Sequence, residues 1–226
     1  VTSFVGWNLI GSLAGVAKEQ GVNVVLNMFF GPAVNAARGI AYQVLGKLNG
    51  FVSNFQMAMN PQIIKNYAAG DKEDMYKLVF RGAKLSYILL LILSLPVAVE
   101  APLVLGIWLK EVPDYTAIFL RLAILTALLN TLSNPLIIST HASGKVRDYQ
   151  IVVGGISLLT LPIVYVAFKL GAEPYYAMVI AFAVEFVCHI TRLYMLERIM
   201  DFPMVKFLKS VTIRVYIVTI LSVVLP

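Results

Sequence analysis

Runs of about 20 apolar residues recur along this chain, and they constrain its fold more than any other feature. Four such runs cover residues 85–109, 115–140, 149–170 and 175–196. A helix of about 20 residues crosses the roughly 30 Å hydrocarbon core of a bilayer and satisfies its own backbone hydrogen bonds there. We therefore expect an all-α, polytopic membrane protein.

The composition excludes a water-soluble monomer. Apolar residues make up 59% of the 226 and charged residues 13%, whereas a soluble domain has roughly 45–50% and about 25%. The net charge is +6, but the basic residues lie mainly between the apolar runs. Membrane topology explains such a distribution, so we expect no nucleic-acid partner.

Turn signals divide the chain into about seven transmembrane helices. Gly31-Pro32 separates the first helix from the second, and Asn60-Pro61 is expected to break or kink the second. The expected spans are residues 2–30, 32–59, 85–109, 115–140, 149–170 and 175–196, followed by a truncated seventh that begins near residue 207.

The segments between these spans, and the ends of the chain, complete the expected organisation. Residues 62–84 are polar and basic, which predicts a connecting loop with a short amphipathic helix, and Pro96 and Pro102 are expected to kink the third span. We expect a six-helix bundle over residues 1–200 and the start of a further helix over residues 201–226. Because the chain begins without Met and stops inside an apolar run, we expect both ends to be cut from a longer protein.

Lysine and arginine are strongly biased to alternate connections, which predicts the orientation. One side has only Lys110 and Lys169. The other has Lys65, Lys72, Lys77, Arg81, Lys84, Lys145, Arg147, Arg192, Arg198, Lys206, Lys209 and Arg214. By the positive-inside rule, the second side is cytoplasmic.

Polar residues form one stripe on each of the first two spans. The first stripe has spacings of 4, 3, 4 and 4, and comprises Asn8, Ser12, Gly15, Glu19 and Asn23. The second comprises Asn35, Arg38, Tyr42, Asn49, Ser53, Gln56 and Asn60. At about 100° per residue, each set stays on one helical face.

Charged residues within these spans are the strongest candidates for function. Each costs about 2.5–3.5 kcal/mol to insert, so it needs a protein-lined or water-filled environment. Lys18, Glu19, Arg38 and Lys47 together carry a formal charge of +2, which suits an anionic ligand such as a phosphate-bearing lipid. The expected cavity residues are Lys18, Glu19, Asn35, Arg38, Tyr42, Lys47 and Asn49. Structural pairing, snorkelling and helix packing are the alternative interpretations.

The sixth span has Glu185, His189 and Arg192 at positions i, i+4 and i+7, on one helical face. Because histidine changes protonation near neutral pH, Glu185 and His189 are candidates for ion coupling. Mutual neutralisation of neighbouring charges is the simpler interpretation.

Enzyme signatures are missing from the sequence. The aspartates form no Asp-x-Asp pair, and there is no Gly-x-Ser-x-Gly, P-loop or His-Glu-x-x-His motif. Cys188 is the only cysteine, which excludes an intramolecular disulfide and a cysteine metal cluster. We expect no catalytic residues, no metal and no cofactor.

Several segments resemble the Wzx-type polysaccharide flippases, in particular the lipopolysaccharide biosynthesis proteins common in Bacteroidetes. These proteins belong to the superfamily that includes the multidrug and toxic-compound extrusion transporters. The matching segments are residues 6–11, 27–41, 60–68, 106–109, 112–113, 142–145 and 149–150.

The resemblance implies a protein of twelve to fourteen helices in two bundles, of which this chain would be the second, C-terminal bundle. It implies a multi-pass protein of the bacterial inner membrane that moves an undecaprenyl-diphosphate-linked oligosaccharide to the outer leaflet. Arg38 and Lys47 would then lie in a cationic central cavity. The implied partners are that anionic lipid-linked oligosaccharide, membrane lipids and the missing N-terminal bundle.

Other functions remain open at this point. A drug or cation antiporter of the same superfamily would be expected to have a cavity rich in acids. A membrane polysaccharide polymerase or glycosyltransferase would be expected to have large outer loops, but the predicted outer links are short. A non-transporting scaffold would tolerate the loss of every buried charge.

Overall fold

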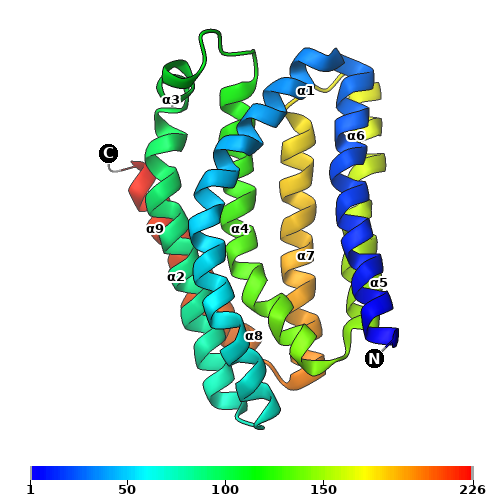
Figure 1. Cartoon of the computed structure of the whole chain (residues 1–226), viewed down its shortest axis with the longest axis vertical. Helices are drawn as coiled ribbons and strands as arrows, with labels where there is room; N and C mark the ends of the chain where they lie inside the picture. The colour runs from blue at the N-terminus through cyan, green and yellow to red at the C-terminus, as the bar shows by residue number, and fades with distance from the viewer. Residues whose placement is uncertain (1, 225–226) are drawn as a thin grey trace.

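A computed structural model describes residues 2–224 as a bundle of long helices, and no strand occurs in that range. The first helix, α1 (Thr2–Ala68), folds back on itself at Gly31, where φ is 80° and ψ is 178°. Figure 1 shows its two halves descending from this turn. The predicted break at Gly31-Pro32 is therefore confirmed. We call residues 2–30 the first half of α1 and residues 32–68 its second half.

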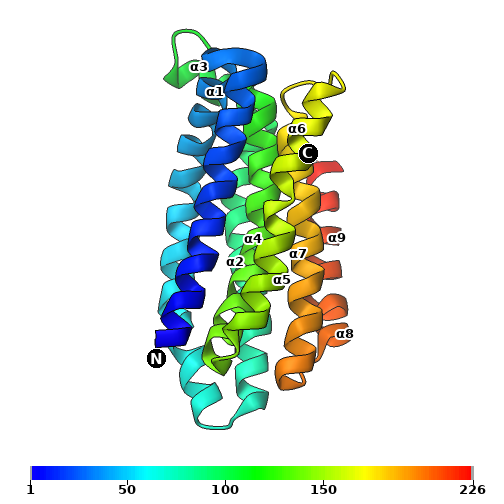
Figure 2. The same ribbon diagram turned by 90° about the vertical axis from the view of Figure 1, so that its right-hand side faces the viewer.

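The remaining helices run up and down the bundle, with α3 continuing in the direction of α2 and α6 in the direction of α5 (Figures 1 and 2). They are α2 (Lys72–Val99), α3 (Ala101–Trp108), α4 (Thr116–Ser143), α5 (Val146–Leu158), α6 (Thr160–Lys169), α7 (Tyr176–Met200), α8 (Met204–Phe207), the π-turn η1 (Leu208–Thr212) and α9 (Ile213–Val224). Within the described residues, 5 helices are long and apolar enough to cross a membrane. This count takes the two halves of α1 as one helix, and α5 with α6 as another. The expected all-α, polytopic membrane fold is confirmed.

The segment of residues 62–84 differs from the prediction, because it is helical except at residues 69–71. Pro61 lies inside α1 and does not end it. Buried side chains hold this extension to α2, namely Met59 and Ile63 on α1 with Met75 and Val79 on α2. A proline inside a helix removes one backbone hydrogen bond and its ring clashes with the carbonyl four residues before it, and this apolar packing outweighs that cost.

The two prolines of the third span also act differently from the prediction. The helix ends at Val99 and restarts at Ala101, so the break is at Glu100 and not at a proline kink. Pro96 stays inside α2, and its carbonyl accepts the Glu100 N–H at 3.0 Å. Pro102 lies in the first turn of α3, where a missing N–H costs nothing.

Helix α4 lies at the centre of the bundle, in contact with α1, α2 and α7. The main apolar core fills the space between the second half of α1, α2, α4 and α7. A smaller core joins the first half of α1 to α6 and α7 through Val22, Leu26, Val164, Phe168 and Ala177. The two halves of α1 therefore pack on the bundle through separate apolar cores. Polar side chains lie between these two cores.

The seventh apolar run packs on the bundle through α2. It begins at Met204, earlier than predicted, with α8 and η1 leading into α9. The Tyr87 and Thr219 hydroxyl oxygens lie 2.8 Å apart, within hydrogen-bond distance.

The two ends of the bundle differ in charge as predicted. The links at residues 69–71, 144–145 and 201–203 meet at the end where the lysines and arginines gather, which we call the basic end (Figure 1). One residue was assigned to this end wrongly, because Arg192 is buried inside the bundle. The opposite end has the Gly31 turn and the links at residues 109–115 and 170–175.

Candidate functional site

A polar cavity of about 320 Å³ opens between the two halves of α1, α4 and α7. Its charged lining residues are Lys18, Glu19, Arg38 and Glu185. Its polar uncharged lining residues are Tyr42, Asn49, Thr126, Asn130 and Thr160. The structure thus brings together five of the seven predicted cavity residues, and it adds Glu185 from the predicted coupling pair.

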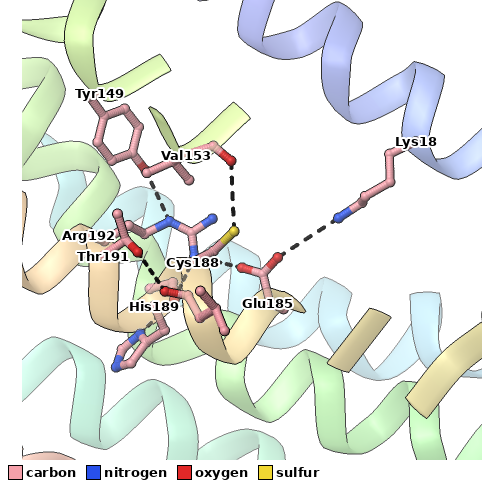
Figure 3. Close-up of polar contacts among 10 residues, drawn as sticks. Lys18, Tyr149, Val153, Glu185, Cys188, His189, Thr191 and Arg192 are labelled. Carbon is pink, nitrogen blue, oxygen red and sulfur yellow. Dashed lines mark hydrogen bonds and ion pairs between the residues drawn. The ribbon is translucent and has the colours of Figure 1, made fainter. Parts of the chain in front are cut away.

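Lys18 and Glu185 face each other across this cavity, as Figure 3 shows, with Lys18 Nζ 3.8 Å from Glu185 Oε2. The Lys18 side chain is 24% exposed, whereas that of Glu185 is 7% exposed. The separation is at the limit of an ion pair and is longer than a hydrogen bond. Lys18 is therefore attracted to Glu185 but is not held by it.

Glu185 is held from the other side by Arg192, two turns further along α7. Arg192 Nη1 donates a hydrogen bond to Glu185 Oε1 at 2.6 Å (Figure 3). Its Nε donates to the Tyr149 hydroxyl at 3.0 Å, and Nη1 also donates to Ser133 Oγ at 3.2 Å. These bonds fix one carboxylate oxygen and leave the other facing Lys18.

His189 belongs to the same buried network, but within the described residues it makes no hydrogen bond or ion pair with Glu185. Its Nδ1 lies 2.9 Å from Ser133 Oγ, and Ser133 in turn accepts from Arg192. Its Nε2 is buried without a hydrogen-bond partner among the described residues. The geometry therefore connects His189 to Glu185 only through Ser133 and Arg192.

Arg38 is the most buried cation of the cavity, with 6% of its surface exposed. Its guanidinium carbon lies 4.6 Å from the centre of the Tyr42 ring, and Nη1 donates a hydrogen bond to Asn23 Oδ1. This arrangement combines a cation–π contact with a hydrogen bond between the two halves of α1. It holds the guanidinium at the cavity wall in a defined orientation.

Lys47 and Asn35 were expected in the cavity, but the structure does not place them in its lining. Lys47 is nine residues from Arg38, and at 100° per residue this turns the side chain by half a circle. It lines a separate groove with Trp108. Asn35 is half-buried nearer the Gly31 turn.

Because Lys47 lies outside the cavity, the formal charge of the site differs from the one predicted from the sequence. Two cations, Lys18 and Arg38, and two acids, Glu19 and Glu185, line the cavity. Arg192 lies directly behind the wall as a third cation. The formal charge is therefore +1, lower than the +2 expected from the sequence.

Residues that the sequence reasoning missed lie mainly on α4. Thr126 and Asn130 line the cavity, and Ser133 connects Arg192 to His189. Their spacing of 4 and 3 is the same signal that identified the stripes on α1. Tyr149 gave no such signal, because its role depends on contact with Arg192 from another helix.

Among the described residues, no group of three or more His, Cys, Asp or Glu side chains is arranged so that it could hold a metal ion.

The sequence profile of one family, MatE, matches residues 19–166, which is more than half of the chain. No curated protein and no solved structure matches it. The matched range begins at Glu19 in the first half of α1 and includes the second half of α1, α2 to α5 and most of α6, whereas Lys18 and Glu185 lie outside it. Together with the polytopic helical fold, this match shows that the chain belongs to the MatE family of membrane transporters.

Proposed function

We propose that this chain is part of a transporter that moves an undecaprenyl-diphosphate-linked oligosaccharide across the bacterial inner membrane for surface polysaccharide assembly. The observation that carries this proposal is the pair of cations, Lys18 and Arg38, that line one cavity from the two halves of α1. Two cations at a cavity wall can neutralise a diphosphate where water is scarce.

The rest of the wall suits a sugar. Tyr42, Asn49, Thr126 and Asn130 supply hydroxyl and amide groups that both donate and accept hydrogen bonds. The volume of about 320 Å³ is at the small end for ligand pockets. It fits the diphosphate and the adjoining sugar, and leaves the rest of the oligosaccharide and the lipid chain outside.

The weak contact between Lys18 and Glu185 suggests how the ligand enters. An incoming diphosphate competes with Glu185 for the Lys18 ammonium, which is only loosely held at 3.8 Å. When Lys18 moves away, Glu185 keeps its hydrogen bond to Arg192 at 2.6 Å. No buried carboxylate is left without a counter-charge, so the transfer of Lys18 from Glu185 to the diphosphate costs little free energy.

Alternating access requires a second body for this bundle to move against, and we propose a further bundle of six helices as that partner. The first half of α1 supports this, since it exposes Glu19, Gln20 and Asn27. Such polar side chains are costly to leave facing lipid, and protein or water must cover them.

A drug or cation antiporter is the second candidate, and the presence of Glu185 in the cavity favours it. A cationic cargo would compete with Lys18 for the free Glu185 oxygen. The flippase therefore requires Lys18 to bind the cargo, whereas the antiporter requires Glu185 to bind it.

Complementation distinguishes these two candidates. The chain is expressed together with its proposed partner bundle in a bacterium that lacks its own flippase and makes a compatible repeat unit, and surface polysaccharide is quantified. We expect restoration by the wild type, loss with Lys18→Gln plus Arg38→Gln, and restoration by Lys110→Gln, which removes an exposed lysine outside the cavity. Resistance to cationic drugs is measured in the same strains.

Failure of the wild type in hosts where it reaches the membrane would overturn the flippase proposal. Drug resistance that Glu185→Gln abolishes would then support the antiporter. Restoration by the double variant would keep the flippase but reject the two cations as its binding site.

A further inference from the structure

Lys47 lies in a groove of its own, distinct from the transport cavity. The groove, of about 380 Å³, runs between the second half of α1 and α3. Its walls are Gln43, Val44, Lys47 and Leu48 from α1, with Val104 and Trp108 from α3. None of these residues lines the polar cavity.

Lys47 differs from the other cations that the sequence places within the spans. Lys18 is close to Glu185, Arg38 donates to Asn23, and Arg121 donates to the carbonyls of Ala98 and Val99. Lys47 is exposed and has no ion pair or side-chain hydrogen bond in the described part of the chain. A cation in a membrane segment requires an anionic or aqueous partner.

Apart from Gln43 and Lys47, the walls of the groove are apolar. Val44, Leu48, Val104 and Trp108 present hydrocarbon and one large aromatic ring, and Trp108 is 54% exposed. Trp108 ends α3 near the links opposite the basic end, where tryptophan typically marks the membrane interface. A soluble anion would satisfy Lys47 but would gain nothing from these apolar walls.

We propose that this groove binds an anionic phospholipid of the surrounding bilayer. The Lys47 ammonium pairs with the lipid phosphate, and an acyl chain packs along Val44, Leu48 and Val104. Lysine binds phosphate as a point charge, and its four-carbon stem lets the ammonium reach toward the headgroup. This site does not depend on which cargo the cavity transports.

The two tryptophans of the chain, Trp7 and Trp108, make the groove directly measurable. After Trp7→Phe, Trp108 is the only tryptophan of the chain, and it lies in the groove. The full chain with this change is reconstituted in phosphatidylcholine bilayers containing a small fraction of brominated phosphatidylglycerol, or the same fraction of brominated phosphatidylcholine. We expect at least twofold stronger quenching of Trp108 by the brominated phosphatidylglycerol.

Charge variants test whether Lys47 causes this preference. Lys47→Gln is expected to abolish it, and Lys47→Arg to retain it. Lys110→Gln is the matched control, because it removes an exposed lysine two residues from Trp108 that does not line the groove. Retention of the preference in this control separates a specific site from general attraction of anionic lipid to the protein.

Three outcomes would overturn the proposal. Equal quenching by both lipids would mean that the groove has no preference for an anionic headgroup. A preference that survives Lys47→Gln would assign it to other cations. Absence of quenching by either lipid would mean that water or another protein segment covers the groove.

Discussion

Arg192 and Glu185 form a buried ion pair two turns apart on α7, with Arg192 Nη1 2.6 Å from Glu185 Oε1. Their side chains are only 9% and 7% exposed. Because each charge compensates the other where water is scarce, removal of one leaves the other buried and uncompensated. The pair thus contributes to the stability of the fold, and it also holds Glu185 in place in the cavity wall.

We expect Glu185→Leu and Arg192→Leu each to lower the free energy of unfolding by about 3–5 kcal/mol. The double variant should lose less than the sum of the two, by about 1–3 kcal/mol, since neither member of the buried pair remains without the other. Titration with a denaturing detergent measures these values in the purified protein. Lys72→Gln, which breaks the exposed ion pair with Asp201, is the control and should show no resolvable change. Additive single-variant losses would contradict this account.

Ser133 and Ser139 provide a comparison of two equally buried hydroxyls on α4. Both are 0% exposed, but Ser133 bonds to Arg192 and His189 on α7, whereas Ser139 donates only to the Pro135 carbonyl of its own helix. Ser133→Ala leaves two polar groups on α7 without this partner and should cost about 1–3 kcal/mol. Ser139→Ala should cost clearly less. Equal shifts in the thermal unfolding midpoint would show that the contact with α7 contributes nothing.

Arg38 and Tyr42 are expected to act together in transport. Tyr42→Phe keeps a ring beneath the guanidinium and loses only the hydroxyl, so it should reduce export less than Tyr42→Leu, which also removes the cation–π contact and should reduce export several-fold. Arg38→Lys should also reduce export, because an ammonium cannot reproduce the planar stacking and the bond to Asn23 together. Membrane protein levels are measured in parallel, and full export by Tyr42→Leu would refute the role of the stacking.

Gly31 and Gly39 test the turn between the two halves of α1. Gly31 has φ of 80° and ψ of 178°, a region that is essentially restricted to glycine. Gly31→Ala should therefore cost about 1–3 kcal/mol. A Cβ at Gly39 would meet nothing within 4 Å, and alanine is the better helix former, so Gly39→Ala should be neutral or stabilising by up to about 1 kcal/mol. Unfolding of the two variants by denaturing detergent provides the comparison, and equal stabilities would argue against a strained turn at Gly31.

The sequence predicted the helical membrane fold, because that depends on local features. Apolar runs long enough to cross a bilayer define the spans, and Gly31-Pro32 marks the first turn without knowledge of any contact. The predictions failed where packing outweighed a local signal. Pro61 predicts a break, yet the buried contacts of Met59 and Ile63 with α2 keep the helix intact.

The candidate site could be predicted only in part. Arg38, Tyr42 and Asn49 share one helical face, so periodicity alone groups them, and the same periodicity points Lys47 the other way. No local pattern could join Glu185 to Lys18, since they are 167 residues apart and meet only because α7 and the first half of α1 line the same cavity.

The sequence by itself therefore determined that this chain crosses a membrane as a helical bundle, and which residues are costly to bury there. The tertiary structure alone decided which of those residues share a cavity and which charges neutralise one another. The physical reason is that insertion into a bilayer depends on each segment's own hydrophobicity. Electrostatic pairing depends instead on distances of a few ångströms between helices that are far apart in the chain.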